Sequence, residues 1–181
     1  MKNKNKFALT FFLTYLFLTF CSYSSESFNF DVTEIEIKEN GNIFVGKNNG
    51  TATSTDGTKI DANNFEYNKI KNILTSSGKV KILDPKNNII IYSDKVTYFK
   101  NDELIFTNGN SKAIDDKVEI DANNFEYNKL SDIIYATGNV KINNKKEKYL
   151  IFSDEITYNK KIGKVFTKNN SKALSEGIDC L

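Results

Sequence analysis

The sequence Ile60-Asp61-Ala62-Asn63-Asn64-Phe65-Glu66-Tyr67-Asn68-Lys69 returns with the same ten letters at residues 120–129, a distance of 60 positions. Other segments keep this distance: residues 78–82 resemble 138–142, residues 93–98 resemble 153–158, and residues 111–113 match 171–173. A fixed period of this length indicates one supersecondary unit that the chain uses repeatedly.

Each period divides again into two shorter units. The pattern Ile91-x-Ser93-x-x-Val96-x-Tyr98 overlays Ile60-x-Ala62-x-x-Phe65-x-Tyr67 at an offset of 31, and the following offsets are 29 and 31. A weaker first copy is present at Phe30-x-Val32-x-x-Ile35-x-Ile37. We therefore predict five half-units of roughly 30 residues between Phe28 and Ala173.

Alternation of apolar and polar residues predicts strands rather than helices. Apolar residues follow a two-residue period at Phe28, Phe30 and Val32, and again at Ile35 and Ile37, which is typical of a strand with one buried face. Asn40-Gly41 and Asp56-Gly57 predict tight turns, because these residue types tolerate positive φ. No stretch beyond residue 24 has a convincing helical period.

The alternation is interrupted at one equivalent place in every unit. Ala62 and Phe65 are three residues apart, and the same step recurs at residues 93–96, 122–125 and 153–156. If the residues on both sides face one core, one extra residue must be absorbed there, as in a β-bulge. We expect each unit to bend its sheet at this point, with the small Ala or Ser inside the bend.

These patterns predict an all-β fold of ten to fifteen short strands, packed as two sheets about 10 Å apart. The large pair Val80 and Ile82 is followed one half-unit later by the small pair Ser111 and Ala113. From this alternation we expect successive half-units to fall on opposite sheets. Both ends of such an array would expose strand edges, which invite pairing with another chain.

Composition restricts the function. With 39% hydrophobic and 27% charged residues in 181, the chain has the composition of one globular domain. The absence of His removes the commonest general base and most zinc sites, and no Gly-rich phosphate loop is present. Asp61 and Asn63 lack the spacing of a calcium loop. We therefore expect no enzyme, no metal and no cofactor. All basic residues are Lys, without interleaved stacking aromatics, which argues against nucleic acid.

Residues 1–24 have the pattern of an export signal. Lys2, Lys4 and Lys6 precede an apolar run of 14 residues, Phe7–Phe20, and small residues follow. This run is shorter than the ~18–20 residues of a comfortable membrane span; an uncleaved anchor is the alternative. We predict a signal peptide at 1–24 and a single domain at 25–181. Cleavage would remove Cys21, change the net charge from +2 to −1, and leave Cys180 as the single thiol.

Aromatic side chains would be abundant on the inner face. Tyr67, Tyr98, Tyr127 and Tyr158 recur at the same phase of each unit. One interpretation is a dry sandwich core. The other is a sandwich whose sheets splay apart and leave an apolar groove for acyl chains. Composition leaves both open.

The order of the motifs resembles the OstA-like repeats of the lipopolysaccharide (LPS) transport proteins. The resemblance is carried by the pattern at residues 120–129, by Ala136-Thr137-Gly138-Asn139-Val140-Lys141-Ile142, and by Ser-Asp-Glu-Ile-Thr-Tyr-Asn-Lys at 153–160. It extends over nearly all of Phe28–Ala173. Two members of the family fit, the soluble bridge protein of the LptA type and the N-terminal domain of the outer-membrane assembly protein of the LptD type.

The resemblance implies a β-jellyroll, open along one side, that shields the acyl chains of lipid A in the periplasm. It also implies LPS as ligand, other jellyroll modules joined by strand addition, and an outer-membrane barrel as partner for the LptD type. The inward residues that would line the lipid groove are Ile60, Phe65, Tyr67, Val80, Ile82, Val96, Tyr98, Phe106, Ile120, Phe125, Tyr127, Val140, Ile142, Ile156 and Tyr158.

A rival hypothesis is an exported structural β-solenoid or adhesin-like protein whose repeats only stack. It predicts a dry core and no lipid binding. The interrupted alternation in each unit and the unequal halves of each 60-residue period favour the jellyroll.

Overall fold

The computed structural model describes residues 27–175. The predicted export signal and both cysteines lie outside the described residues. No helix in the described part of the chain has the length and apolar character needed to cross a membrane.

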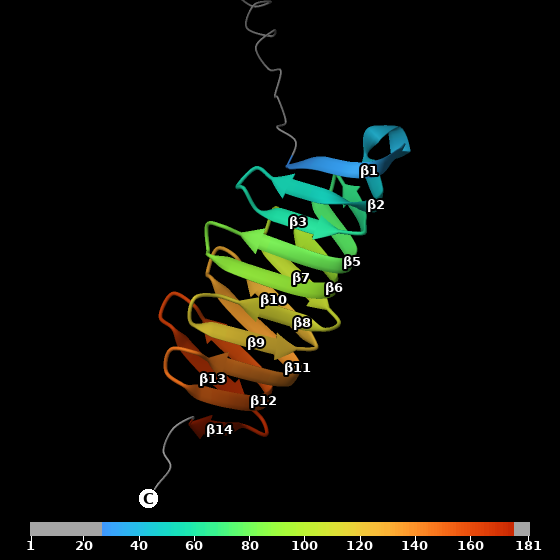
Figure 1. Cartoon of the computed structure of the whole chain (residues 1–181). Coiled ribbons are helices and arrows are strands. Elements are labelled where there is room, and N and C mark those ends of the chain that lie inside the picture. Colours follow the sequence, from blue (N-terminus) through green and yellow to red (C-terminus); the bar gives the residue numbers. More distant parts are fainter. Residues whose placement is uncertain (1–26, 176–181) are drawn as a thin grey trace, which may run out of the picture.

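The protein is an all-β structure, as predicted. Hydrogen bonds connect all its strands, and Figure 1 shows them stacked along one long axis, from β1 at one end to β14 at the other. The elements are β1 (Phe28–Lys38), a 3-10 turn (Glu39–Gly41), β2 (Ile43–Ser54), β3 (Lys59–Ala62), β4 (Asn64–Asn68), β5 (Ile73–Asp84), β6 (Ile89–Phe99), β7 (Leu104–Asn108), β8 (Ser111–Ile114), β9 (Val118–Ala122), β10 (Asn124–Asn128), β11 (Ile133–Asn144), β12 (Tyr149–Asn159), β13 (Lys164–Lys168) and β14 (Lys172–Ser175).

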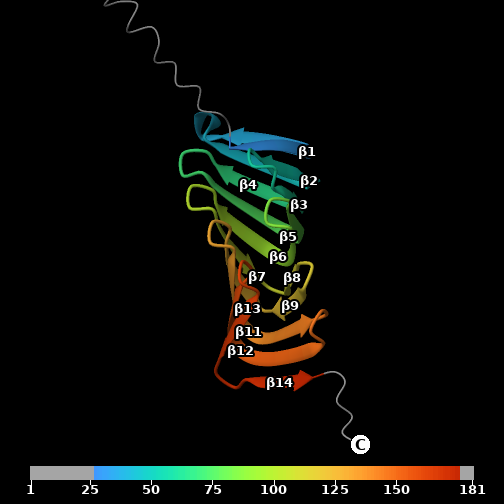
Figure 2. The ribbon, with the colours of Figure 1, turned by 90° about the vertical axis from the view of Figure 1, so that its left-hand side faces the viewer.

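The sheet is folded into two layers. The first half of β2 pairs with β4 and its second half with β3; β11 divides in the same way between β10 and β9. We call the layer with β3, β8, β9 and β14 layer 1, and the layer with β4, β7, β10 and β13 layer 2. The long strands β1, β2, β5, β6, β11 and β12 run through both. Figure 2 shows β4 and β7 on one side of the stack and β3 and β8 on the other.

The predicted bends are present and form a continuous line along one side. The amides of Asn63 and Asn123 donate to the carbonyls of Gly78 and Gly138 at 3.0 and 2.8 Å. Pairing shifts register at the same level, between Ser77 and Val80 and again 60 residues later. The small residues predicted inside the bends, Ala62, Ser93, Ala122 and Ser153, are all buried. Gly78 has φ of +80°, and a Cβ there would lie 2.9 Å from the side-chain nitrogen Nδ2 of Asn63. Glycine takes this position in three bends, at residues 78, 109 and 138, and Asn169, also at positive φ, takes it in the last.

The expectation that successive half-units fall on opposite sheets is wrong. Each half-unit crosses a bend and contributes one strand segment to each layer. The large and small pairs alternate instead between strands of layer 1, where Ala113 lies between Ile91 and Ile120. The small side chain of Ala113 leaves room for the two large side chains beside it. The alternation of large and small pairs therefore reflects packing between neighbouring strands of one layer.

Candidate functional site between the two layers

The inward faces of the two layers form one apolar core. The structure places fourteen of the fifteen residues predicted to line a groove in this core, and none of them is more than 4% exposed. They come from both layers: Ile60 and Ile120 lie in layer 1, Phe65 and Phe125 in layer 2. The repeat phase therefore identified a set of side chains that share one interior. Their contact with lipid stays a prediction.

Phe106 does not belong to this set, and the prediction that it faces the core is wrong. It lies on the outer face of β7, where it is 36% exposed and packs edge-on against Phe99 at 5.6 Å between ring centroids. Its neighbour Ile105 points inward instead, because Ile105 pairs with Tyr98 on one side and Tyr127 on the other. Adjacent strand residues face opposite ways, so only one of the two apolar side chains can enter the core.

Aromatic rings fill the space between the layers near β1. Phe28, in layer 1, has its ring 5.1 Å from Tyr67 and 5.7 Å from Tyr98, both in layer 2. Phe30 stacks on Phe44 at 6.1 Å. The repeat motif did not identify these rings, because the first copy of the repeat has diverged from the others. The alternation from Phe28 to Val32 could have identified Phe28 and Phe30.

Both ends of the stack leave the inward face uncovered. At the first end, Ile35 and Ile37 are 54% and 59% exposed, although they pair with Gly46 and Phe44 on the inward face of layer 2. At the other end, Val165 is half-buried and all four residues of β14 are exposed. Among the described residues, β1 pairs only with β2, and β13 and β14 pair only with β12. Each end therefore combines an apolar surface with an unpaired strand edge.

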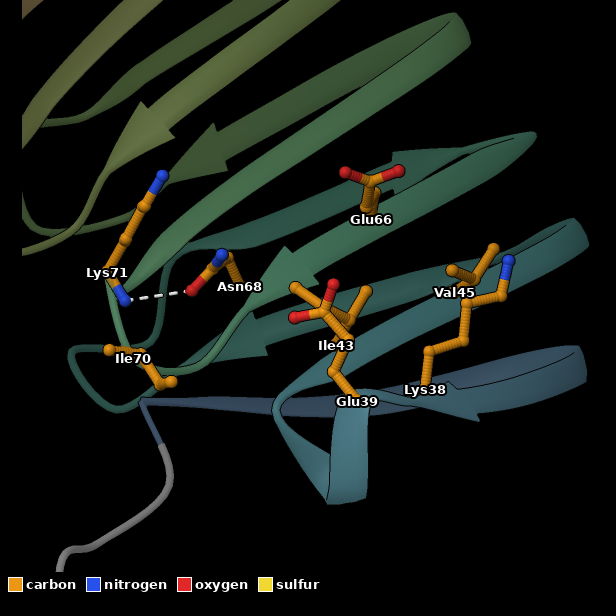
Figure 3. Close-up of a pocket in the computed structure, with 8 residues that line it drawn as sticks. All are labelled: Lys38, Glu39, Ile43, Val45, Glu66, Asn68, Ile70 and Lys71. Atoms are coloured by element: carbon orange, nitrogen blue, oxygen red, sulfur yellow. Dashed lines mark hydrogen bonds between the residues drawn. The ribbon is translucent and has the colours of Figure 1, made fainter.

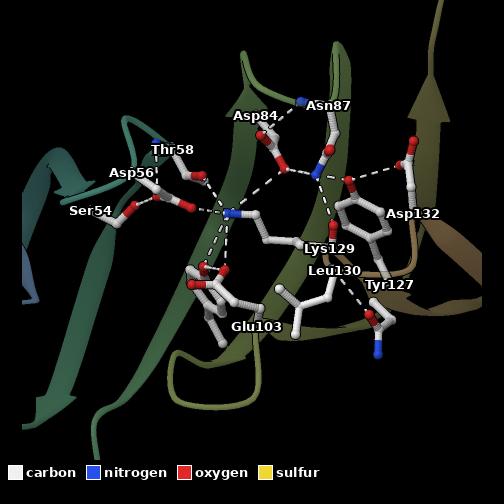
Figure 4. A network of polar contacts seen from close by, with 12 residues as sticks. Ser54, Asp56, Thr58, Asp84, Asn87, Glu103, Tyr127, Lys129, Leu130 and Asp132 are labelled. Atoms are coloured by element: carbon white, nitrogen blue, oxygen red, sulfur yellow. Dashed lines mark hydrogen bonds and ion pairs between the residues drawn. The ribbon is translucent and has the colours of Figure 1, made fainter.

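The long side opposite the bends is bridged at its centre by polar side chains (Figure 4). Lys129, at the end of β10 in layer 2, is 3% exposed at its side chain and reaches the turn between β2 and β3 in layer 1. Its Nζ lies 2.6 Å from Asp56 Oδ2 and donates to Thr58 Oγ1 at 2.6 Å. Lys160, one half-unit further, donates to the carbonyl of Asn87 in layer 1 at 2.8 Å.

Sequence reasoning missed these lysines. Their signal is the motif Tyr-x-Lys, which recurs at residues 67–69, 98–100, 127–129 and 158–160. The tyrosine enters the core, and in the last three copies its hydroxyl and the lysine contact carboxylates at the long side. Tyr158 donates to Asp115 at 2.9 Å, and Tyr127 donates to Asp84 at 3.3 Å.

A surface depression on the outer face of layer 2 is a different kind of site. It is lined by Lys38, Glu39, Ile43, Val45, Glu66, Asn68, Ile70 and Lys71 (Figure 3). Glu66 and Val45 face away from the core, since their strand neighbours Phe65 and Phe44 face into it. The mixture of opposite charges and open sides gives no enclosed volume for an acyl chain.

Comparison with known proteins identifies the family. Residues 59–164, more than half of the chain, match the family described as "LptA/(LptD N-terminal domain) LPS transport protein". The chain belongs to this LPS transport family. A crystal structure of LptH from Pseudomonas aeruginosa, described as the LptA homologous periplasmic component of the LPS transport device, is similar over 84% of this chain and 99% of that chain, with 11% identity and a TM-score of 0.38. No curated protein matches the sequence significantly.

In this LPS transport protein the groups of the bridged side are set for hydrogen bonding rather than for proton transfer. Burial raises the pKa of Tyr98, and the nearby carboxylate of Glu103 raises it further. Burial is also the main cause that raises the pKa of Tyr127 and of Tyr158. The three phenols therefore remain neutral hydrogen-bond donors. Burial acts to raise the pKa of Asp56, but hydrogen bonds from Lys129 and Ser54 outweigh it, and the net pKa is lowered. Asp56 therefore stays ionised beside the ammonium group.

Proposed function

We propose that the protein transports LPS through the periplasm by shielding the acyl chains of lipid A between its two layers. One observation carries this proposal: a continuous apolar inward face runs the length of the stack and is uncovered at both ends. The predicted export signal supports the periplasmic location. The family match supports LPS as the cargo.

Shielding of this kind costs little free energy, because core side chains exchange contacts with each other for contacts with the lipid. Each acyl CH₂ taken out of water contributes about 0.8 kcal/mol. Where a chain lies between Phe125 of layer 2 and Ile120 of layer 1, the side chains replace contacts with each other by contacts with the lipid. The core therefore remains out of water whether it is closed or loaded, and successive modules offer similar affinity.

Photo-crosslinking tests this proposal at one residue. A photoreactive amino acid at Phe125, which is 2% exposed and faces the core, is expected to capture LPS in cells. The matched control is the next residue, Glu126, which is exposed on the outer face and should capture none. Equal labelling at both positions, or none at Phe125, would contradict a lipid path between the layers.

Direct binding separates this function from the structural alternative. The purified chain should bind labelled LPS saturably and should prefer it to a phospholipid of equal chain length. A folded, β-rich protein without binding would support the stacking repeat, for which the close packing of the core, with many side chains at 0–2% exposure, is the favouring observation.

The two ends of the stack are proposed to join modules in series by strand addition. The pairing of β8 with β9 inside this chain shows what such a junction between modules would look like. There Lys112 lies opposite Asp121, with Nζ and Oδ1 3.0 Å apart. The repeat offsets place Lys172 of β14 and Asp31 of β1 at the equivalent positions. The β1 end also carries Glu34 and Glu36, whereas β13 carries Lys164 and Lys168. This complementary charge supports head-to-tail joining and favours a bridge-type module.

Charge reversal tests the joint. Asp31→Lys should weaken self-association at low salt by roughly threefold to tenfold, because an exposed pair contributes about 0.2–1 kcal/mol and the reversal replaces attraction by repulsion. Adding Lys172→Asp should restore it, as measured by sedimentation velocity. Lys141→Asp, on the outer face between the ends, is the control. Failure of the second charge to rescue the first would refute this register.

A further inference from the structure

Lys129 is surrounded by groups from three separate segments. Besides Asp56 and Thr58, its Nζ lies 3.2 Å from Glu103 Oε2 and 3.7 Å from Asp84 Oδ2, and it donates to Tyr98 Oη at 3.0 Å. Figure 4 shows its extended side chain reaching into the middle of these groups. One ammonium group therefore connects the β2–β3 turn, the end of β5 and the β6–β7 turn.

These contacts connect the two layers. Asp56 and Asp84 lie where strands of layer 1 end at the long side opposite the bends. Lys129 and Glu103 lie where strands of layer 2 end at the same side. Asn87 extends the connection, because its Nδ2 donates to the Lys129 carbonyl at 3.1 Å and its own carbonyl accepts from Lys160. The centre of the long side is thus closed by polar contacts over successive half-units.

Burial of this ammonium group is not required by the repeat. Lys69 has the same ten-residue sequence around it, yet it is exposed. In the strand pairing, the positions equivalent to Tyr98 and Glu103 are Ile37 and Asn42, which supply neither hydroxyl nor carboxylate. A buried ion cluster is in general no more stabilising than well-packed apolar residues, so its retention needs another reason.

We propose that Lys129 is the latch that holds the long side shut at its centre, so that lipid enters and leaves through the ends of the stack. This inference rests on the proposed lipid path between the layers. Without the Lys129 ammonium group, Lys100 still lies 3.4 Å from Asp56 and pairs with Glu103, but Asp84 loses its ion pair with Lys129. Three carboxylates then share one cation, and the stronger repulsion among them separates the layers there. Lys129 is a positioning residue: it acts on the path and need not touch the cargo.

The test compares Lys129→Met with Lys69→Met, the equivalent and exposed lysine of the preceding repeat. The full chain is loaded with fluorescent LPS, and release into an excess of unlabelled LPS is followed by stopped flow. Release from Lys129→Met should be about tenfold faster than from wild type, and capture faster by a similar factor, so that the equilibrium affinity changes much less. Lys69→Met should behave as wild type.

Amide hydrogen exchange of the lipid-free protein provides a second readout. Exchange should accelerate in residues 55–58 and 84–88 of Lys129→Met and stay unchanged in Lys69→Met. If Lys129→Met does not fold, the charge-balanced double variant Asp56→Asn/Lys129→Met takes its place. A variant that exchanges faster but releases LPS at the wild-type rate would reduce Lys129 to a structural role and overturn the latch. A wild type that binds no LPS would overturn the lipid path itself, while the exchange data would still decide whether Lys129 closes the long side.

Discussion

Replacement of Asp84 by Ala is expected to lower the free energy of unfolding by about 3–5 kcal/mol, the range for breaking a buried ion pair at one partner. Asp84 is fully buried at the end of β5. Its carboxylate accepts from the Asn87 amide at 3.2 Å, from Asn87 Nδ2 at 3.0 Å and from Tyr127 Oη at 3.3 Å. Alanine would leave these donors, and Lys129, with one acceptor fewer in a region that excludes water. Urea denaturation measures the loss.

The repeat itself supplies the control for this variant. At the equivalent place in the next period the chain has Asn144, whose Oδ1 accepts from the Glu147 amide at 2.8 Å. Asp84→Asn should therefore retain the turn and lose only the charge, at less than half the cost of Asp84→Ala. Because a protein of this size loses about 2–4 °C of Tm per kcal/mol, the two variants are separable by calorimetry. An alanine variant that melts with wild type would show that the carboxylate stabilises nothing.

Ile134→Ala is expected to cost about 2–5 kcal/mol, the usual range for a large-to-small change in a packed core. Ile134 is fully buried and pairs with Tyr127 on one side and Tyr158 on the other, at the centre of layer 2. The cavity would lie where the layers meet, and neighbouring strands hold its walls in place.

The adjacent residue is the matched control. Ile133 has the same side chain but lies half-buried on the outer face. Ile133→Ala should therefore lower the free energy of unfolding by well under 1 kcal/mol. Chemical denaturation of the two variants side by side checks the assignment of faces. Equal losses would mean that the inward and outward phases of β11 are wrongly assigned.

Much of the fold could be predicted from the sequence because the responsible interactions are local and repeated. Alternation predicts strands, and the step from Ala62 to Phe65 predicts a bend, since both follow from the direction of successive side chains along one strand. Four copies of the bend made the inference robust. The same phase placed all but one of the fifteen proposed lining residues in the core.

Pairing between strands decided what the sequence left open. Ile105 and Phe106 are neighbours of similar apolar character, and only the partners Tyr98 and Tyr127 determine which of them points inward. The passage of every half-unit through both layers was likewise missed, because the large and small pairs describe packing within layer 1 and not the path of the chain.

The repeated ten-residue sequence shows where local information ends. It determines the same strand, the same bend and the same inward Phe and Tyr at residues 60–69 and 120–129. It does not determine that Lys69 is exposed and Lys129 is buried among three carboxylates. The carboxylates come from the β2–β3 turn, the end of β5 and the β6–β7 turn, which the fold gathers around Lys129. A charge takes its environment from whatever the fold brings beside it, and here only the tertiary structure made that choice.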